Sequence, residues 1–142
     1  MEHLPEFISN HIFLCGGLVA VLVMLIKAEL DHQVSKAFQI SPVSAVRMIN
    51  NDDALLLDVR EPAEYGRGHI QDARNIPFSS LKEKLNGIMQ YKDKPVLAYC
   101  GSGVVSGRAC KTLKHAGFSN VHNLEGGLVS WQDAKLPLTN KT

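Results

Sequence analysis

The chain has 142 residues, enough for one compact domain and a short additional segment. Its 15 lysine and arginine residues nearly balance its 14 aspartate and glutamate residues, so the formal net charge is +1. The basic residues are scattered and form no stripe, which argues against a nucleic-acid partner. The three cysteines form neither a CxxC pair nor a zinc-ligand spacing, which is typical of a reducing compartment.

The N-terminal part of the chain is predicted to be a membrane anchor. Residues 12–26 carry no charged side chain. Counting back to Phe7 gives a segment of 20 residues, and a helix of that length extends about 30 Å, which matches one bilayer crossing. We therefore expect residues 1–38 to form an anchor that spans the membrane at about 7–26, followed by a juxtamembrane connector.

A cleaved signal peptide and a buried core helix are the alternatives for this segment. A signal peptide begins with basic residues and ends at a small-residue cleavage site. This N-terminus instead carries Glu2 and Glu6, and Lys27-Ala28-Glu29-Leu30 lacks the cleavage pattern. A core helix would need a domain to cover it, whereas the rest of the chain already accounts for a complete domain. The sequence favours the anchor.

The distribution of positive charge predicts the orientation of the anchor. No lysine or arginine precedes the apolar segment, whereas Lys27, Lys36 and Arg47 follow it. The positive-inside rule places the side with more positive charge in the cytoplasm. We expect a single-pass protein of the inner (cytoplasmic) membrane whose C-terminal domain faces the cytoplasm.

Residues 39–142 alternate between helical and strand-like patterns. Ser41-Pro42 is typical of a helix start, and the apolar run at 54–59 indicates a strand covered on both faces. The further predicted elements are a short helix from Glu61, a strand at 73–77, a helix from Ser79 or Ser80 to Met89, a strand at 96–99, a helix ending at Gly117, a strand at 121–124 and a final helix from Gly126-Gly127 through Trp131. This alternation predicts an α/β fold with a parallel sheet.

Cys100 stands where a predicted strand ends and a helix begins. The residues after it are small or apolar: Gly101, Ser102, Gly103, Val104, Val105, Ser106 and Gly107. Backbone N–H groups in such a turn can point inward, and the helix dipole adds partial positive charge; both favour a thiolate. A thiolate held by amides is a nucleophile and a carrier for a transferred group. The alternative is a small buried hydrophobe, the usual role of a lone cysteine.

Four motifs resemble the rhodanese homology domain family, in the order that the family has them. They are Leu57-Asp58-Val59-Arg60-Glu61-Pro62-Ala63-Glu64-Tyr65 with Gly68-His69-Ile70 and Ala73-Arg74-Asn75-Ile76-Pro77, the strand–Cys100 loop–helix, Ala116-Gly117-Phe118-Ser119-Asn120-Val121, and Leu124-Glu125-Gly126-Gly127-Leu128 with Trp131. The resemblance covers residues 39 to 138 and is greatest to membrane-tethered single-domain bacterial rhodaneses. It implies a five-stranded, mainly parallel sheet with helices on both faces.

The resemblance also implies a sulfurtransferase activity. Cys100 would accept a sulfane sulfur as a persulfide and pass it to a thiol or a cyanide-like acceptor. The donor would be a small sulfur compound or a persulfide-bearing protein. The residues expected to bind the persulfide are Gly101, Ser102, Gly103, Val104, Val105, Ser106, Arg60 and Asp58. Since amides can hold the anion, no cofactor or metal is expected.

Two positions depart from the family pattern. Many members have a basic residue directly after the cysteine and an arginine at the sixth loop position, where this chain has Gly101 and Val105. An anionic donor such as thiosulfate then loses charge-assisted hydrogen bonds worth about 1.5–3 kcal/mol each. We expect slow turnover with thiosulfate and a physiological donor that is less charged or protein-borne.

The same loop argues against a cysteine phosphatase or an arsenate reductase. Phosphatases of related architecture need Cys-x5-Arg, because the guanidinium grips phosphate with two hydrogen bonds. Six positions beyond Cys100 lies Ser106, and Arg108 lies eight beyond.

The remaining candidates have a structural interpretation beside the functional one. Asp58 ends a predicted strand, where it serves either the site or a turn, and Arg60 is favoured as a structural partner of a carboxylate. We expect His69, Cys110 and Trp131 to be structural. The alternative function for the whole chain is a membrane-tethered rhodanese-like interaction module with little or no catalysis; keeping Cys100 and its glycine-rich loop favours the sulfurtransferase.

Overall fold

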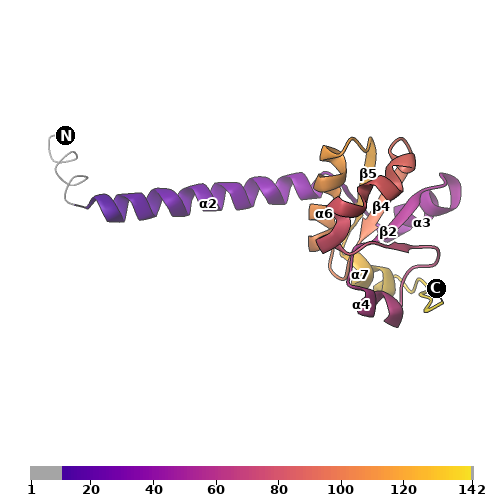
Figure 1. Cartoon of the computed structure of the whole chain (residues 1–142). Coiled ribbons are helices and arrows are strands. Elements are labelled where there is room, and N and C mark those ends of the chain that lie inside the picture. The colour runs from indigo at the N-terminus through magenta and orange to yellow at the C-terminus, as the bar shows by residue number, and fades with distance from the viewer. Residues whose placement is uncertain (1–10, 142) are drawn as a thin grey trace. The chain divides into compact units, whose positions relative to one another are not determined.

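The computed structural model describes residues 11–141 (Figure 1). The chain divides into two compact units, one up to Val34 and one from Ser35 onward. Each unit is described by itself below.

In the described part of the first unit the chain forms one long helix, α2 at Ile12–Lys36, whose last residues belong to the second unit. Its stretch Ile12–Gln33 has 22 residues and is long and apolar enough to cross a membrane. The helix continues beyond residue 26, where the span was predicted to end, because the following alanine, leucine, lysine and glutamate residues are good helix formers. Most of the predicted connector is therefore helical, whereas residues 7–10 of the predicted span lie outside the described part.

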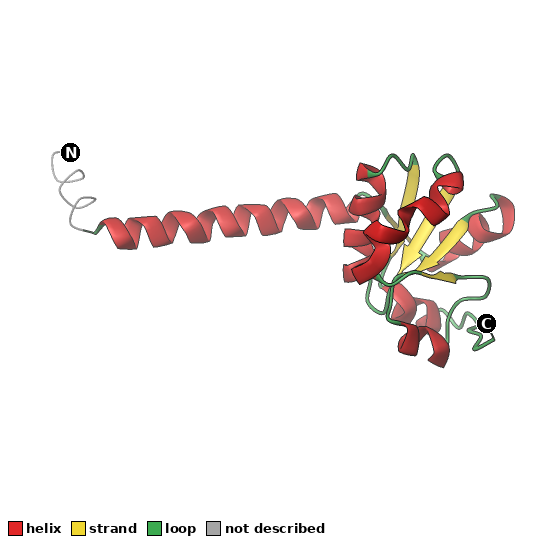
Figure 2. Cartoon of the chain, in the orientation of Figure 1, coloured by secondary structure: helices red, strands yellow, loops and turns green. Residues whose placement is uncertain are grey.

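The second unit is built on one sheet with helices on both faces (Figure 2). The strands are β1 Gln39–Ile40, β2 Leu55–Asp58, β3 Arg74–Asn75, β4 Pro95–Tyr99 and β5 Asn120–Leu124. Their spatial order is β1-β5-β4-β2-β3, and all neighbouring pairs are parallel. The predicted α/β class and the five-stranded parallel sheet are confirmed.

The helical elements connect these strands. They are α3 Pro42–Asn51, α4 Pro62–Arg67, the 3-10 helix η1 Phe78–Ser80, α5 Leu81–Lys84, the 3-10 helix η2 Leu85–Tyr91, α6 Val104–His115 and α7 Gly127–Asp133. The Ser41 side chain caps α3 by accepting a hydrogen bond from Ser44 N, as its sequence predicts.

Alternating side chains of the central strands form two cores, one on each face. Leu55 and Leu57 of β2 pack with residues of α6 on one face. Leu56 packs on the other face with Ala45 of α3 and Trp131 of α7. Because both faces are covered, the central strands are apolar throughout, which explains the continuous apolar run in the sequence.

Three local predictions differ from the structure. The segment predicted as one helix up to Met89 is mostly 3-10 helix, because its apolar residues Leu85, Ile88 and Tyr91 recur every three residues. Helix α6 begins at Val104 and not at Ala109, where the sequence predicts its start, because Gly103 adopts a left-handed conformation directly before Val104 and turns the chain into the helix. Strand β1 was not predicted, since its two residues are strand only by pairing with β5.

Candidate active site

The turn after β4 brings Cys100 to the carboxyl edge of the sheet, where parallel α/β sheets bind ligands. Cys100 is 4% exposed. Gly103 closes the turn at φ +91°, and a side chain there would meet the carbonyl oxygen of Leu124 at 3.2 Å. A glycine is therefore required for the chain to turn so sharply into α6.

The Cys100 sulfur faces several hydrogen-bond donors. The N–H of Gly103 lies 3.1 Å from Sγ, and the N–H of Ser106 lies 3.5 Å from it. The Ser106 hydroxyl is 3.3 Å away. The predicted cradle is thus present, and its donors come from the turn and the first turn of α6.

The two cysteines of the second unit differ in their acidity. Burial raises the pKa of the Cys100 thiol, but hydrogen bonds from Ser106, Gly103 and Ser102 outweigh it, so that the pKa lies below its ordinary value. Burial raises the pKa of the Cys110 thiol to about 12, and the charge of Cys100 adds to this effect. The thiolate therefore forms more readily at Cys100 than at Cys110.

Helix α7 holds the Cys100 loop in place through backbone hydrogen bonds. The N–H of Leu128 donates to the carbonyl oxygen of Cys100 at 2.9 Å, and that of Val129 donates to Gly101 at 3.2 Å. Gly127 has φ +59°, and a Cβ on it would lie 2.5 Å from the Cys100 carbonyl oxygen. The second glycine of the Gly126-Gly127 motif therefore makes room for the loop.

Asp58 and Arg60 form a buried pair beside the loop. Arg60 Nη2 lies 2.7 Å from Asp58 Oδ2, and Nε lies 3.1 Å from both carboxylate oxygens. Arg60 Nη2 also donates to the carbonyl oxygen of Gly68 at 2.7 Å. These contacts support the structural interpretation of both residues.

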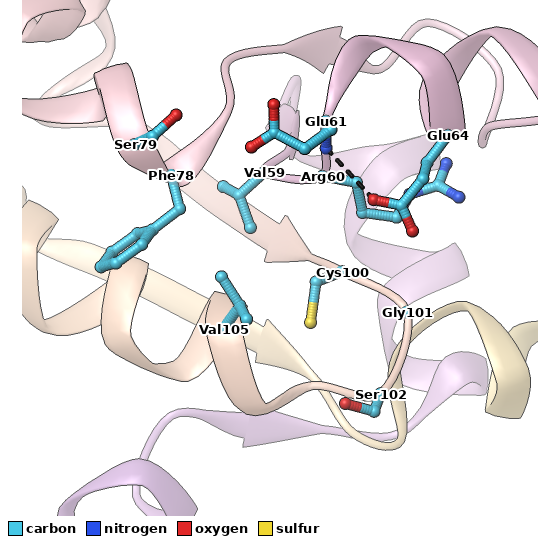
Figure 3. A pocket seen from close by; sticks show the side chains of 10 residues that line it. All are labelled: Val59, Arg60, Glu61, Glu64, Phe78, Ser79, Cys100, Gly101, Ser102 and Val105. Carbon is cyan, nitrogen blue, oxygen red and sulfur yellow. Dashed lines mark hydrogen bonds between the residues drawn. The ribbon is translucent and has the colours of Figure 1, made fainter.

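The Cys100 side chain opens onto a cavity of about 480 Å³ (Figure 3). Its apolar walls are Val59, Phe78 and Val105. Its charged lining residues are Arg60, Glu61 and Glu64. Because Arg60 is paired with Asp58, two carboxylates and no unpaired cation remain among the residues that line the cavity.

The predicted site residues occupy three kinds of place. Gly103 and Ser106 contact the sulfur. Lining the cavity are Gly101, Ser102, Val105 and Arg60. Val104 is 62% exposed on the first turn of α6, and Asp58 is completely buried beneath Arg60. Within residues 11–141 no group of histidine, cysteine, aspartate or glutamate side chains has the arrangement of a metal site.

Two parts of the site were not identified from the sequence. The first is the part of the cavity lining outside the Cys100 loop and Arg60, for which the sequence gives no signal: Val59, Glu61, Glu64, Phe78 and Ser79. Asn123, on β5, is completely buried and touches Ser106. The sequence gives no clear signal for it, because β5 also contains the polar residues Asn120 and His122, and only the structure shows that Asn123 is the buried amide that needs hydrogen-bond partners.

A comparison with known protein families shows to which family this domain belongs. The rhodanese-like domain family matches residues 41–134. The chain belongs to this family. The resemblance found in the sequence motifs is thereby confirmed, and the fold agrees with a rhodanese-related protein of Thermoplasma volcanium at a TM-score of 0.66 and 32% identity, over 72% of this chain and 98% of the other.

Relatives of this rhodanese-like chain differ in the length they share with it. It is 32% identical to the uncharacterized protein YibN of Escherichia coli K12 over 97% of both chains. It is 51% identical to the uncharacterized protein YqhL of Bacillus subtilis over 55% of this chain and 60% of YqhL. A sulfurtransferase of Allochromatium vinosum is 38% identical over 65% of this chain and 84% of its own length.

Proposed function

We propose that this rhodanese-like protein is a sulfurtransferase or persulfide carrier in which Cys100 is the nucleophile. The observation that carries the proposal is the position of Cys100 Sγ, which faces the N–H groups of Gly103 and Ser106 and opens onto a cavity. The sulfurtransferase of Allochromatium vinosum supports the same reaction class.

The reaction proceeds in two displacements at sulfur. The Cys100 thiolate attacks the outer sulfur of a persulfide donor R–S–SH, the new S–S bond forms, and the donor's S–S bond breaks with its electron pair leaving on R–S⁻. A thiolate or cyanide acceptor then attacks the outer sulfur of the Cys100 persulfide, and Cys100 leaves as a thiolate. The inward N–H groups stabilise the anionic sulfur in both steps, so the chemistry needs no proton relay.

The charge in the cavity favours donors other than thiosulfate. The positions of Gly101 and Val105 offer no cation, and the guanidinium of Arg60 is held by Asp58 and the Gly68 carbonyl. A dianion would meet the carboxylates of Glu61 and Glu64 without a compensating positive charge. We therefore expect a donor that is less charged or carried on a protein.

Helix α2 is proposed to anchor this activity at the inner membrane. A core helix would be buried against the rest of the protein, whereas none of the side chains in the apolar window of Ile12–Gln33 is buried. Lys27 and Lys36 follow the apolar part, which supports a cytoplasmic position for the rhodanese-like domain.

The decisive experiment measures the intact mass of the protein after incubation with a sulfur donor. The wild-type chain should gain the mass of one sulfur atom, located on Cys100, and lose it on addition of cyanide. Cys100→Ser should gain nothing, because a serine hydroxyl forms no persulfide, whereas Cys110→Ser should behave as the wild type. If no donor loads the wild type and Cys100→Ser has no effect in cells, the interaction-module alternative replaces the enzyme.

A further inference from the structure

The Ser106 hydroxyl faces two acceptors but carries one proton. Its oxygen lies 2.6 Å from Asn123 Oδ1 and 3.3 Å from Cys100 Sγ. Ser106 and Asn123 are completely buried, so bulk water does not reach the hydrogen bond between them. The Ser106 hydroxyl therefore donates its hydrogen bond either to the amide oxygen of Asn123 or to the sulfur of Cys100.

The orientation of the Asn123 amide is fixed by its other end. Asn123 Nδ2 donates to the carbonyl oxygen of Gly103 at 2.9 Å. The flipped amide would bring two oxygen acceptors together at that distance, which is unfavourable. Oδ1 therefore faces Ser106 and, being only an acceptor, must receive the Ser106 proton.

The consequence for Cys100 depends on the charge of its sulfur. While Ser106 donates to Asn123, its oxygen presents a lone pair to Sγ and can accept a hydrogen bond from a neutral thiol. A thiolate instead needs a hydrogen-bond donor. If the Ser106 hydroxyl donates to the thiolate, the buried Oδ1 of Asn123 loses its hydrogen bond, which is costly. The stable arrangement of Ser106 thus differs between the thiol and the thiolate.

We propose that Asn123 is a positioning residue that competes with Cys100 for the Ser106 proton and so restrains formation of the thiolate. It acts through Ser106 and does not touch the sulfur itself. The use of this restraint in sulfur transfer rests on the proposed function, whereas the competition for the hydrogen bond concerns the free cysteine alone. In a persulfide the charge lies mainly on the outer sulfur, so the inner sulfur no longer needs a hydrogen bond from Ser106. The Ser106 hydroxyl can then donate to Asn123 Oδ1 again.

The other groups around the sulfur do not supply this competition. Across the cavity the charged groups are Arg60, Glu61 and Glu64, and the Arg60 guanidinium is bound to Asp58. From α6, Cys110 is held neutral at physiological pH by its burial. Of the donors that contact Sγ, Ser106 Oγ is the one that has a second acceptor at 2.6 Å.

The test is a double-mutant cycle on the reactivity of Cys100, with Asn123→Val, Ser106→Ala and the double variant in the full chain in detergent. Asn123→Val removes the competing acceptor, so alkylation of Cys100 by iodoacetamide below its pKa should become about tenfold faster, the size of one charge-assisted hydrogen bond. With Ser106→Ala in the background, Asn123→Val should change nothing. An equal acceleration in both backgrounds, or none in either, would overturn the proposal.

A second measurement avoids any loss of folding in the variants. In the wild-type chain, the side-chain amide signals of Asn123 in an NMR titration should shift at the same pH at which Cys100 loses its proton. The Cys100→Ser chain should show no such shift. In the persulfide form the signals should resemble those of the thiol; amide signals that stay constant across the wild-type titration would contradict the inference. The alkylation cycle and the pH titration require no sulfur transfer, so a failure there is separate from a failure of the proposed activity; only the comparison with the persulfide form needs a loaded Cys100.

Discussion

Arg60 and Asp58 form a buried ion pair in which the guanidinium meets both carboxylate oxygens, with Nη2 at 2.7 Å from Oδ2. The Arg60 side chain is 9% exposed and that of Asp58 is completely buried. The same Nη2 donates to the Gly68 carbonyl oxygen, and Asn75 Nδ2 donates to the Arg60 carbonyl oxygen. Arg60, although it lines the cavity, therefore holds the loops at the carboxyl edge together.

Removing the arginine should destabilise the fold. Arg60→Met leaves the Asp58 carboxylate buried without its partner, so the free energy of unfolding should fall by about 3–5 kcal/mol. Urea titration of the full chain in detergent, followed by the fluorescence of its single tryptophan, Trp131, measures this change. The matched control is Lys94→Met, whose partner Asp53 forms a close but exposed pair. That substitution should leave stability almost unchanged, and equal effects of both would contradict the structural role.

The two cysteines of the rhodanese-like domain should react very differently with an alkylating agent. The rate at Cys100 should rise with pH and level off above a pKa lower than that of a free thiol, since the thiolate is the reactive form. Cys110, whose burial raises its pKa to about 12, should stay unmodified over the same range. Mass-spectrometric assignment of the adducts at each pH checks both statements. Equal rates at both sites, with a midpoint at the free-thiol value, would rule out a prepared thiolate.

Adding cations to the loop should improve the use of thiosulfate. In Gly101→Arg with Val105→Arg, the new guanidinium groups offer charge-assisted hydrogen bonds to a dianion. Nothing lies within 4 Å of a Cβ on Gly101, so the larger side chain fits there. We expect kcat/KM with thiosulfate to rise by about tenfold or more, and much less with an uncharged persulfide donor. A parallel rise with both donors would mean that charge recognition is not what the two substitutions change.

Gly127→Ala should displace the loop that carries Cys100. Its φ is +59°, and the added Cβ would lie 2.5 Å from the Cys100 carbonyl oxygen. We expect a loss of about 1–3 kcal/mol in stability from the backbone strain alone. The rate of persulfide formation should fall by about tenfold or more as the sulfur moves away from its N–H donors. Gly87→Ala, where no atom lies within 4 Å, is the control and should leave the rate unchanged.

The rhodanese-like domain should lie on the cytoplasmic side of the membrane. Lys27 and Lys36 follow the apolar stretch of α2, and no lysine or arginine precedes it. Fusions of a reporter to the C-terminus test this, because some reporters are active only in the periplasm and others only in the cytoplasm. The chain should also stay with the membranes in a carbonate wash. A fusion active only in the periplasm would reverse the proposed orientation.

Much of this protein follows from local patterns in its sequence. The apolar run of β2, the Ser41-Pro42 helix start and the uncharged stretch within α2 each determine an element through the properties of neighbouring residues. The motifs around Cys100 likewise indicate a loop between a strand and a helix, because small residues and glycines are needed for so tight a turn. The fold class could therefore be predicted, as could a helix that is long and apolar enough to cross a membrane, while the nucleophile stays a prediction.

The surroundings of the nucleophile depend on contacts between residues far apart in the chain. Asn123 reaches Ser106 because β5 pairs with β4, with Ala98 opposite Asn123, and no local pattern fixes that register. Gly127 supports the Cys100 loop only because α7 packs back against it. The sequence alone thus indicated Cys100 as the candidate nucleophile, whereas the tertiary structure decided which hydrogen-bonding and charged groups face it, since those are set by packing across the sheet.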